Sequence, residues 1–298
     1  MDYKTPDDLN EFLQEVVNNP FRNHTHTEAW KCEVLKQDGR YHTEQILEKG
    51  TADFNTGSDG GLTPDDKVII YCYYYMQMHI VSSFHVFTSS DSFLKDYIRD
   101  PSKNIVFIDF GCGPLTSGVA LAWYYGFLDD KQQDFHYIGI DNGEAMIRKA
   151  REISERQAWR SCTFNFLESY EDHVYILKMI ASYLSSGKYQ DYLIVLNYSY
   201  LFASSTLDVS NLAQLGEKIL DTNKSHKICL FYQNPIPGFL NSKLNRKWDE
   251  FKSKSFFQEK LCPVVEQKAI LSYRNTTGRV KEGEFTEIKL HFETLVSK

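Results

Sequence analysis

The sequence predicts an α/β fold in which a mostly parallel sheet of seven strands, ending in an antiparallel hairpin, follows an N-terminal helical cap. Apolar runs of strand length alternate with helical periods between residues 104 and 232, as in parallel sheets. Two runs of alternating hydrophobicity follow near the C-terminus, as expected for a hairpin. The first hundred residues show helical periodicity instead. We therefore expect a cap over residues 1–100 and an α/β domain over residues 101–298.

The cap is predicted to consist of helices. The first helix has an apolar face formed by Leu9, Phe12, Leu13 and Val16. Residues 27–50 have a mostly helical pattern, and residues 54–66 form a loop rich in Gly, Asp and Asn that ends in a helix start. A Pro-containing turn near residue 100 ends the cap before the first strongly apolar strand.

An aromatic segment from Val68 to Ser90 contains no Asp, Glu, Lys or Arg. Its length could span a bilayer, but Gln77, His79 and His85 interrupt it, and a span rich in Tyr and Ser would insert poorly. The pattern therefore favours a buried helix and predicts no membrane association. Because the helices of a βα sheet already cover its two faces, we expect this segment to lie over the carboxyl ends of the strands as a lid.

Five strands are expected in the α/β domain, each followed by a helix or a turn, at residues 105–110, 135–140, 162–167, 191–197 and 227–232. The hairpin is expected at residues 267–274 and 285–295. Before it, an apolar stripe predicts a docked helix whose core-facing residues are Leu240, Leu244, Trp248 and Phe251. The basic residues off this stripe form a solvated face or, alternatively, meet an anionic ligand.

Composition narrows the classes of function and location. The chain has 33 Lys and Arg against 40 Asp and Glu, a net charge of −7, so a nucleic-acid partner is disfavoured. The six cysteines lie far apart without a C-x-x-C pair, so we expect reduced thiols and no structural zinc. His24 and His26 are spaced too closely to converge on one ion from a helix, so no metal is predicted. The N-terminal residues lack the pattern of a secretory signal, which predicts a cytoplasmic protein.

A glycine-containing turn follows the first strand, in the sequence Asp109-Phe-Gly-Cys-Gly-Pro. The order strand, glycine turn and helix places backbone N–H groups and a helix N-terminus beside a polar ligand group. A dinucleotide-binding turn would need a third glycine where the chain has Thr116, so NAD is disfavoured. A turn without any ligand is the alternative.

A second acidic position lies at the end of the second strand. Asp141 stands where ligands bind in open α/β sheets, and a carboxylate there can accept hydrogen bonds from both ribose hydroxyls. Its alternative role is to cap the helix that follows.

Together the two segments resemble the first two motifs of the class I S-adenosylmethionine-dependent methyltransferases, which have a Rossmann-like sheet. The resemblance covers roughly residues 104–232. The first motif is filled by Asp109, Phe110, Gly111, Cys112, Gly113, Pro114 and Thr116. The second motif is filled by Asp141, Asn142, Met146 and Ala150.

The resemblance implies S-adenosylmethionine as the cofactor and assigns roles to these positions. Gly111, Cys112 and Gly113 would line its methionine and ribose, and Asp109 would order the loop or meet the methionine ammonium. Asp141 would bind the ribose hydroxyls, with Asn142 and Met146 against the adenine. Glu168, after the third strand, would contact the adenine or, alternatively, cap the next helix.

The acceptor side is assigned to the fourth and fifth strand ends and to the aromatic segment. Asn197 and Tyr200 follow the fourth strand, and an Asn-Pro-Ile-Pro sequence beginning at Asn234 follows the fifth. That sequence differs in position and residues from the signature of DNA amino-methyltransferases, so DNA methylation is disfavoured. Because proline lacks a backbone N–H, its two prolines are expected to end the strand. If a general base exists, His79 and His85 are the candidates. The predicted lid residues against the substrate are Tyr71, Tyr74 and Tyr75.

The resulting hypothesis is an enzyme, a methyltransferase acting on a small molecule or metabolite in a pocket closed by the cap. RNA or protein methylation is the alternative acceptor class, and a non-catalytic S-adenosylmethionine-binding or scaffold protein is the alternative outside enzymes. The acceptor and the oligomeric state stay open, with a homodimer as one alternative.

Overall fold

The computed structural model describes residues 1–126, 134–156, 159, 161–236, 245–277 and 284–298. In this part of the chain the sheet has eight strands in the order β1-β7-β8-β6-β5-β2-β3-β4. The strands are β1 (Asp2–Tyr3), β2 (Lys103–Phe110), β3 (His136–Ile140), β4 (Thr163–Leu167), β5 (Asp191–Ser199), β6 (Lys227–Pro235), β7 (Leu261–Arg274) and β8 (Phe285–Ser297).

The five predicted parallel strands are confirmed. β2 pairs in parallel with both β3 and β5, β3 with β4, and β5 with β6. β8 pairs antiparallel with β6 and β7, so the predicted terminal hairpin is confirmed as well. β6 ends at Pro235, as predicted from the prolines there.

Two features of the sheet differ from the prediction. β7 begins at Leu261, earlier than expected, because a register shift between Pro263 and Val265 lets the strand accommodate a proline. The short β1 adds an eighth strand by pairing in parallel with Ser272 and Tyr273 of β7. A two-residue strand gives too little periodicity to be recognised in a sequence.

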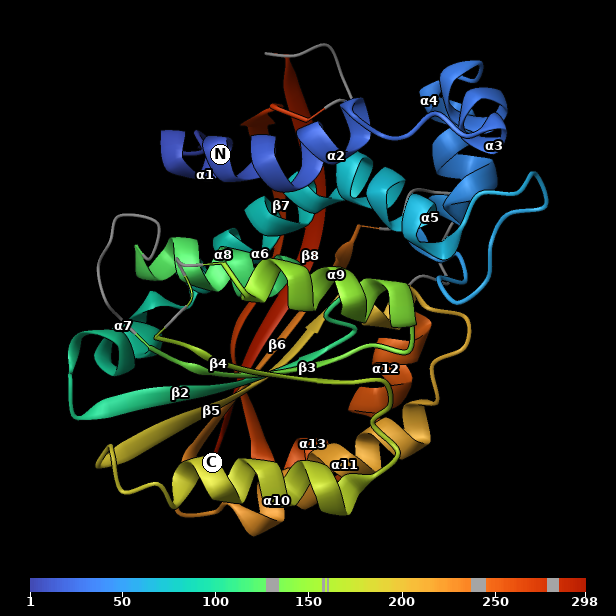
Figure 1. Cartoon of the computed structure of the whole chain (residues 1–298). Helices are drawn as coiled ribbons and strands as arrows, with labels where there is room; N and C mark the ends of the chain where they lie inside the picture. Colours follow the sequence, from blue (N-terminus) through green and yellow to red (C-terminus); the bar gives the residue numbers. More distant parts are fainter. Residues whose placement is uncertain (127–133, 157–158, 160, 237–244, 278–283) are drawn as a thin grey trace.

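Helices cover both faces of the sheet. α8 (Thr116–Tyr125) and α9 (Glu144–Ser154) lie on one face, and α10 (His173–Leu184) and α11 (Val209–Thr222) lie on the other (Figure 1). α12 (Arg246–Lys252) and α13 (Ser255–Lys260) join the second face. Alternate strand residues enter two separate cores: Phe107 packs on the first face and Ile108 on the second.

The predicted docked helix before the hairpin is confirmed where it is described. Trp248 and Phe251 of α12 are fully buried on the second face, whereas Leu240 and Leu244 lie outside the described residues.

The cap is helical, as predicted. Its α-helical pieces are α1 (Asp7–Leu13), α2 (Asn19–Arg22), α3 (Glu28–Trp30), α4 (Gly39–Tyr41), α5 (Pro64–Tyr71), α6 (Gln77–Ser89) and α7 (Asp91–Arg99). π-helical turns connect several of them, at Gln14–Asn18, Lys31–Leu35, His42–Ile46 and Cys72–Met76, and a 3₁₀ turn covers Glu48–Gly50. The predicted start of α5 is confirmed by a capping box between Thr63 and Asp66.

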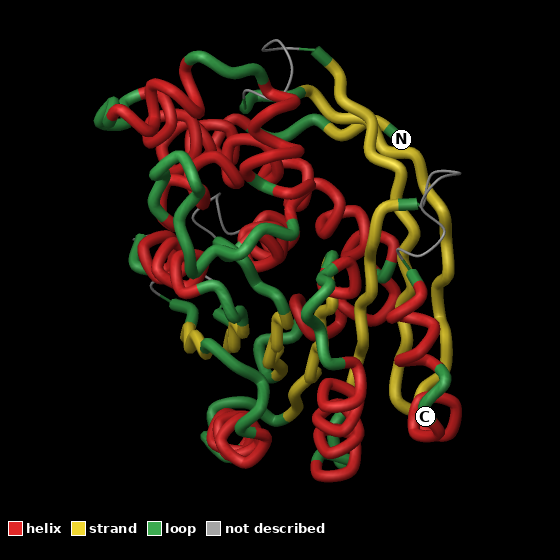
Figure 2. Tube along the Cα trace, turned by 90° about the vertical axis from the view of Figure 1, so that its right-hand side faces the viewer, coloured by secondary structure: helices red, strands yellow, loops and turns green. Residues whose placement is uncertain are grey.

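The cap and the sheet share one hydrophobic core. Buried cap residues such as Leu9, Trp30 and Phe87 belong to the same cluster as Phe107 and Phe231 of the sheet. The N-terminus also lies beside the long β7–β8 hairpin (Figure 2). The division at residue 100 stays a prediction, and the packing across it is continuous.

The charge-free aromatic segment is a buried helix, as predicted, and among the described helices none has the length and apolarity needed to cross a membrane. The expectation that all of it lies over the strand ends is wrong for α6. This helix packs on the sheet face beside α8 and against β6, β7 and β8. The reason is that α11, which follows β5, and α12 and α13, which follow β6, all lie on the second face. Without α6, the first face of β6, β7 and β8 would be exposed. The segment around Tyr71 and His79, before and at the start of α6, does reach the strand ends.

Candidate functional site

The candidate site lies where the parallel strands end. β2 stands in the middle of the sheet, with β3 and β4 on one side and β5 and β6 on the other. The chain therefore changes direction across the sheet next to β2, and open α/β sheets bind ligands outside the carboxyl ends of strands at such a point. The predicted cofactor residues lie at these strand ends, in the loops after them or in the helix that follows β3.

The loop after β2 has an unusual backbone. Gly111, Gly113 and Leu115 have φ values of 72°, 51° and 69°, in the left-handed region. The N–H groups of Gly111 and Cys112 both donate to the carbonyl of Ile140, at 2.7 and 3.1 Å, which fixes the loop against β3. The Cys112 side chain is buried, so this residue offers only its backbone to the edge.

The two glycines have different surroundings. A Cβ on Gly111 would stand 3.1 Å from Cδ1 of Leu201, whereas a Cβ on Gly113 would meet no described atom within 4 Å. Gly113 is therefore the point where another molecule can approach the loop closely. α8 begins next, and Leu115 at its N-cap has no polar side-chain atom to cap the helix.

Asp141 connects the first loop to the second. Its Oδ2 atom accepts the N–H of Gly113 at 2.9 Å, and its Oδ1 atom accepts the N–H of Gly143 at 2.8 Å. Burial raises the pKa of this carboxyl group, and the two N–H donors oppose the rise. A carboxylate has about four lone-pair positions, so two hydrogen bonds leave acceptor capacity for a ligand.

The predicted adenine residues surround Asp141 in different ways. Met146 is buried in α9, and Asn142 is exposed in the turn before it. Glu168 is exposed directly after β4, and the carbonyl of the preceding Leu167 accepts the N–H of Asp141 at 3.0 Å. The alternative that Glu168 caps the next helix is wrong, because α10 begins later and Asp172 caps it by accepting the N–H of Tyr175 at 2.9 Å.

Asp109 and Asn197 lie beneath the loop, not at its exposed side. Both are almost fully buried. Asn197 donates through Nδ2 to Oδ1 of Asp109 at 2.6 Å and to Oγ of Ser117 at 3.1 Å, and the Tyr137 hydroxyl donates to the other Asp109 oxygen. Burial raises the pKa of Asp109 from 3.8 to about 7, although these donors oppose the rise. This network connects β2, β3 and β5 through the side chains of Asp109, Tyr137 and Asn197.

Aromatic rings gather beside the loop, from the cap and from the end of β5. His79 stacks on Tyr200 with ring centroids 4.1 Å apart, and Tyr75 stacks on His79 at 6.0 Å. The Tyr71 hydroxyl is 3.1 Å from Nδ1 of His79. Tyr200 has φ of 60°, a strained conformation for a non-glycine residue, and its hydroxyl donates to Oγ of Ser82 at 3.0 Å. The structure thus brings Tyr71, Tyr75, His79 and Tyr200 together.

Three other predicted acceptor-side residues lie elsewhere. The Tyr74 hydroxyl is 2.7 Å from Nδ1 of buried His42, inside the cap. Asn234 is buried and donates to Asn245 at 3.2 Å on the second sheet face. His85 contacts the Tyr3 hydroxyl at 2.5 Å, far along α6.

Sequence reasoning missed the polar side chains that support the aromatic group. Gln233 donates through Nε2 to Oγ of Ser83 at 2.6 Å and to Oγ of Ser199 at 2.8 Å, and Ser199 donates to Asn197 at 3.0 Å. Alternation along β6 indicates that Gln233 shares a face with Phe231, but Ser83 lies 150 residues away in the sequence. Its contact depends on how α6 is placed and has no local signal.

The order of the strands, the glycine loop after β2 and the acidic residue after β3 together decide the family of folds. The chain has the Rossmann-like fold that its resemblance to the class I S-adenosylmethionine-dependent methyltransferases implies. Its parallel strands, antiparallel end and helix layers match the fold predicted from the sequence.

The chain was also compared with known proteins. No protein-family model and no curated protein sequence matches the chain. Among solved structures, the chain is similar to magnesium protoporphyrin IX methyltransferase ChlM from Synechocystis PCC 6803 with bound SAM, at 11% identity and a TM-score of 0.35 over 93% of this chain and 100% of that one. It is also similar to the plantazolicin methyltransferase BamL, at 12% identity and a TM-score of 0.36 over 97% and 98% of the two chains. A third is YcgJ from Bacillus subtilis, at 11% identity and a TM-score of 0.38 over 70% and 97%.

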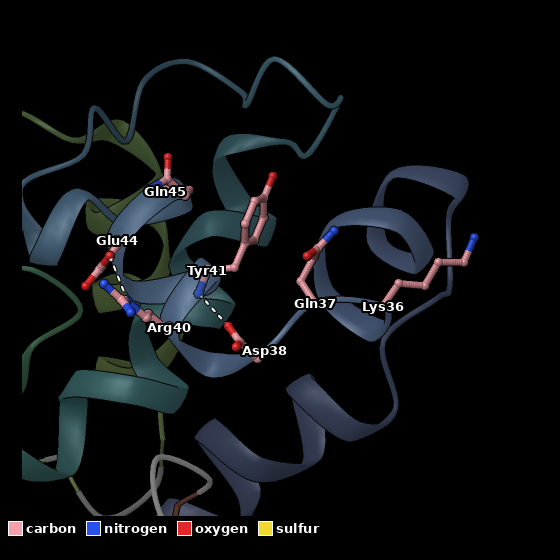
Figure 3. Close-up of a pocket in the computed structure, with 7 residues that line it drawn as sticks. All are labelled: Lys36, Gln37, Asp38, Arg40, Tyr41, Glu44 and Gln45. Atoms are coloured by element: carbon pink, nitrogen blue, oxygen red, sulfur yellow. Dashed lines mark hydrogen bonds and ion pairs between the residues drawn. The ribbon is translucent and has the colours of Figure 1, made fainter.

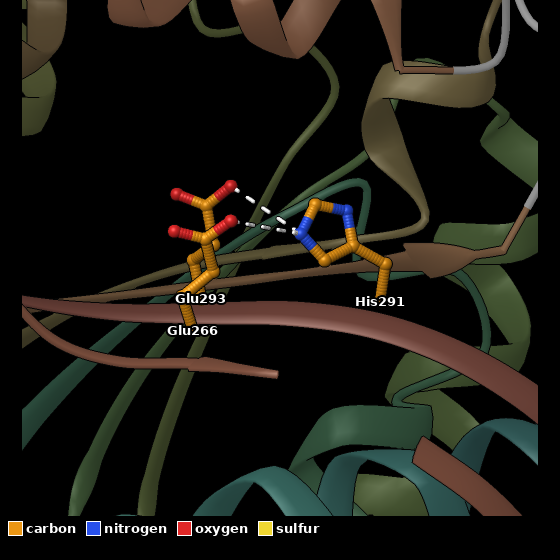
Figure 4. A group of neighbouring side chains, drawn as sticks. All are labelled: Glu266, His291 and Glu293. Atoms are coloured by element: carbon orange, nitrogen blue, oxygen red, sulfur yellow. Dashed lines mark ion pairs between the residues drawn. The ribbon is translucent and has the colours of Figure 1, made fainter. Parts of the chain in front are cut away.

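Away from this edge, the described residues include one cluster with metal-ligand chemistry. Glu266, His291 and Glu293 on β7 and β8 bring one potential ligand atom each to within 4.8 Å of one another (Figure 4). Oε1 of Glu293, however, already accepts hydrogen bonds from Nζ of Lys252 and Nε1 of Trp248, both at 2.7 Å. The lysine ammonium is therefore the cation paired with this buried carboxylate. His24, whose H-x-H spacing with His26 predicts no metal site, contacts Oδ1 of Asp66 at 2.8 Å.

A surface hollow is lined by residues between 36 and 45 of the cap (Figure 3). Several of its charged side chains make local contacts: Asp38 accepts the backbone N–H of Tyr41 at 2.8 Å, and Arg40 pairs with Glu44 at 3.2 Å. These contacts stabilise the short α4, and none of the predicted site residues lines the hollow.

Proposed function

We propose that the chain is an S-adenosylmethionine-dependent methyltransferase that transfers a methyl group to a small-molecule acceptor in a pocket closed by the N-terminal cap. The observation that carries the proposal is the position of Asp141. Its carboxylate lies at the end of β3, is tied to the glycine loop through Gly113, and keeps acceptor capacity for a ligand's hydroxyls.

The residues of this edge fit the cofactor's functional groups. Asp141 would accept hydrogen bonds from the ribose hydroxyls, and the open side of Gly113 leaves room for the ligand to approach the backbone. The uncapped N-terminus of α8 has the polarity to favour the methionine carboxylate. Asn142, Met146 and Glu168 are the residues proposed for the adenine. Asp109 acts through the loop that it supports, since its oxygens are engaged by Tyr137 and Asn197.

The aromatic group is proposed as the acceptor side of the pocket. When bound, S-adenosylmethionine supplies a methyl group on a positively charged sulfonium. Tyr71, Tyr75 and Tyr200 would exclude water and orient the acceptor toward it. His79 would accept the acceptor's proton at Nε2, with its Nδ1–H directed to the Tyr71 hydroxyl. Tyr200 is held for this role by its contacts with Ser82 and His79.

Two features support a small acceptor over a macromolecule. Tyr71, Tyr75 and His79 belong to a cap segment that packs against Tyr200 at a strand end, so the acceptor would enter a space between the cap and the sheet. The net charge of −7 also gives no attraction to a nucleic-acid backbone.

The test is methyl transfer itself. We expect the purified chain, incubated with methyl-labelled S-adenosylmethionine and fractionated cell extract, to place the label in a low-molecular-mass fraction. The Asp141→Ala variant is the control and should give a strongly reduced signal. Labelling confined to RNA or protein would overturn the small-acceptor proposal, and no labelling in any fraction, with cofactor bound, would favour a non-catalytic binding protein.

A further inference from the structure

A loop of the cap, Asp53 to Thr56, lies directly against the turn that carries Asp141. Nδ2 of Asn55 donates to the carbonyl of Asn142 at 2.9 Å, and Oδ1 of Asn55 accepts the N–H of Glu144 at 2.8 Å. One side-chain amide therefore holds the backbone on both sides of Gly143. Since the N-cap of α9 is Gly143, which has no side chain, Asn55 supplies the capping acceptor from 89 residues away.

The loop is itself held in one shape. Oδ1 of Asp53 accepts the N–H of Asn55 at 2.8 Å, and Oδ2 accepts the Thr56 hydroxyl at 3.0 Å. Lys67, only 5% exposed, donates through Nζ to the carbonyls of Asp53 and Thr56 at 2.6 and 3.2 Å. A buried ammonium with two carbonyl partners in one loop fixes that loop firmly. Asn55 is thus presented to the turn from a rigid support.

The same loop touches both halves of the candidate site. Cβ of Phe54 and Oδ1 of Asp141 each lie 3.1 Å from the point where a Cβ on Gly143 would stand, so Phe54 and the carboxylate border the same side of Gly143. The Phe54 ring also meets the Tyr71 ring edge-on, with centroids 5.5 Å apart. The loop therefore connects the cofactor-side turn to the aromatic group on the acceptor side.

We propose that Asn55 is a positioning residue for the cofactor. By fixing the peptide groups of Asn142 and Glu144, it sets the turn from which the Asp141 carboxylate projects and keeps the cap closed on that side of the site. This inference rests on the proposed function. Its consequence is that Asn55 controls how long the cofactor stays bound, although it need not touch it.

The test measures equilibrium binding and dissociation of S-adenosylhomocysteine, the demethylated cofactor, by calorimetry and stopped-flow fluorescence. Asn55→Ala should raise Kd about three- to tenfold, the loss expected for one or two neutral hydrogen bonds, chiefly through faster dissociation. Lys67→Met, which loosens the loop without altering the turn, should act in the same direction. Asp65→Ala is the matched control, because Asp65 makes another polar contact between the cap and α9, an exposed pair with Arg148 at 2.9 Å.

The outcomes distinguish a failure of the Asn55 inference from a failure of the proposed function. A lower melting temperature with unchanged Kd and dissociation rate in both Asn55→Ala and Lys67→Met would make Asn55 only a helix cap and overturn the inference. An equal change of Kd and dissociation rate in Asp65→Ala would also overturn the inference, since any contact between the cap and α9 would then affect cofactor binding as Asn55 does. Absence of S-adenosylhomocysteine binding by the unaltered chain would overturn the proposed function itself.

Discussion

The backbone N–H of Gly113 donates a hydrogen bond to Oδ2 of Asp141 at 2.9 Å, so the loops after β2 and β3 form one unit. The second oxygen of Asp141 is fixed by Gly143, and the turn around Gly143 is held in turn by Asn55 from the cap. A change at any of these positions should therefore be detected first in cofactor binding.

Asp141→Ala should weaken binding of S-adenosylhomocysteine by tenfold or more, because hydrogen bonds to a charged group contribute about 1.5 to 3 kcal/mol each. Calorimetry gives the Kd, and circular dichroism checks that the fold is intact. Asp141→Asn keeps one acceptor oxygen, so its Kd should lie between that of the unaltered chain and that of Asp141→Ala. Equal affinity of all three proteins would leave Asp141 as a helix and loop support only.

Gly111→Ala and Gly113→Ala form a matched pair, because both residues have positive φ and both alanines incur a backbone cost of about 1–2 kcal/mol. Gly111→Ala should mainly lower the free energy of unfolding, since its Cβ would press on Leu201. Gly113→Ala should lower cofactor affinity more strongly than Gly111→Ala does, since its Cβ would occupy the open side of the loop. Urea unfolding and calorimetry on both variants measure the two effects, and identical losses of affinity would contradict this assignment.

Asp109 predicts a pH dependence of stability. Burial raises its pKa from 3.8 to about 7, so the folded chain retains a proton that the unfolded chain loses. The contribution of Asp109 to the free energy of unfolding is fully present below pH 3.8 and is lost as the pH rises to 7. The loss is at most about 1.4 kcal/mol per pH unit. Urea unfolding between pH 4 and pH 8 should therefore show a smaller decline for Asp109→Asn than for the unaltered chain, with no further divergence above pH 7. Parallel curves would contradict the raised pKa.

His79→Ala should slow methyl transfer about 100-fold or more if His79 accepts the proton, because general bases typically contribute 10²–10⁴-fold. Affinity for S-adenosylhomocysteine should change little, since His79 is proposed for the acceptor side. His26→Ala, an exposed histidine of the cap, is the control and should keep the original rate. A full rate in His79→Ala would mean that the site works by orientation and water exclusion without this base.

Most of the sheet could be predicted because its strands are buried on both faces and therefore appear as continuous apolar runs. β2 and β5 are examples, with Ile105 to Phe110 and Tyr192 to Leu196 almost fully buried. The glycine loop and Asp141 were equally recognisable, because positive φ and a strand-end carboxylate each leave a local signature.

The remaining site residues depend on contacts between distant segments. Asn55 reaches Asn142 across 87 residues, and Gln233 reaches Ser83 across 150, so no local pattern marks either contact. The position of α6 has no local signal either, since it depends on which sheet face the helices after β5 and β6 leave uncovered. Asn197 is at the predicted strand end, but only the structure shows its amide turned inward to Asp109.

Titration calorimetry with S-adenosylmethionine, S-adenosylhomocysteine and NAD tests the central claim most directly. We predict that the first two bind with one site per chain, that Asp141→Ala weakens both, and that NAD gives no heat of binding, because Thr116 replaces the third glycine of a dinucleotide loop. Binding of NAD without binding of either S-adenosyl compound would contradict the account.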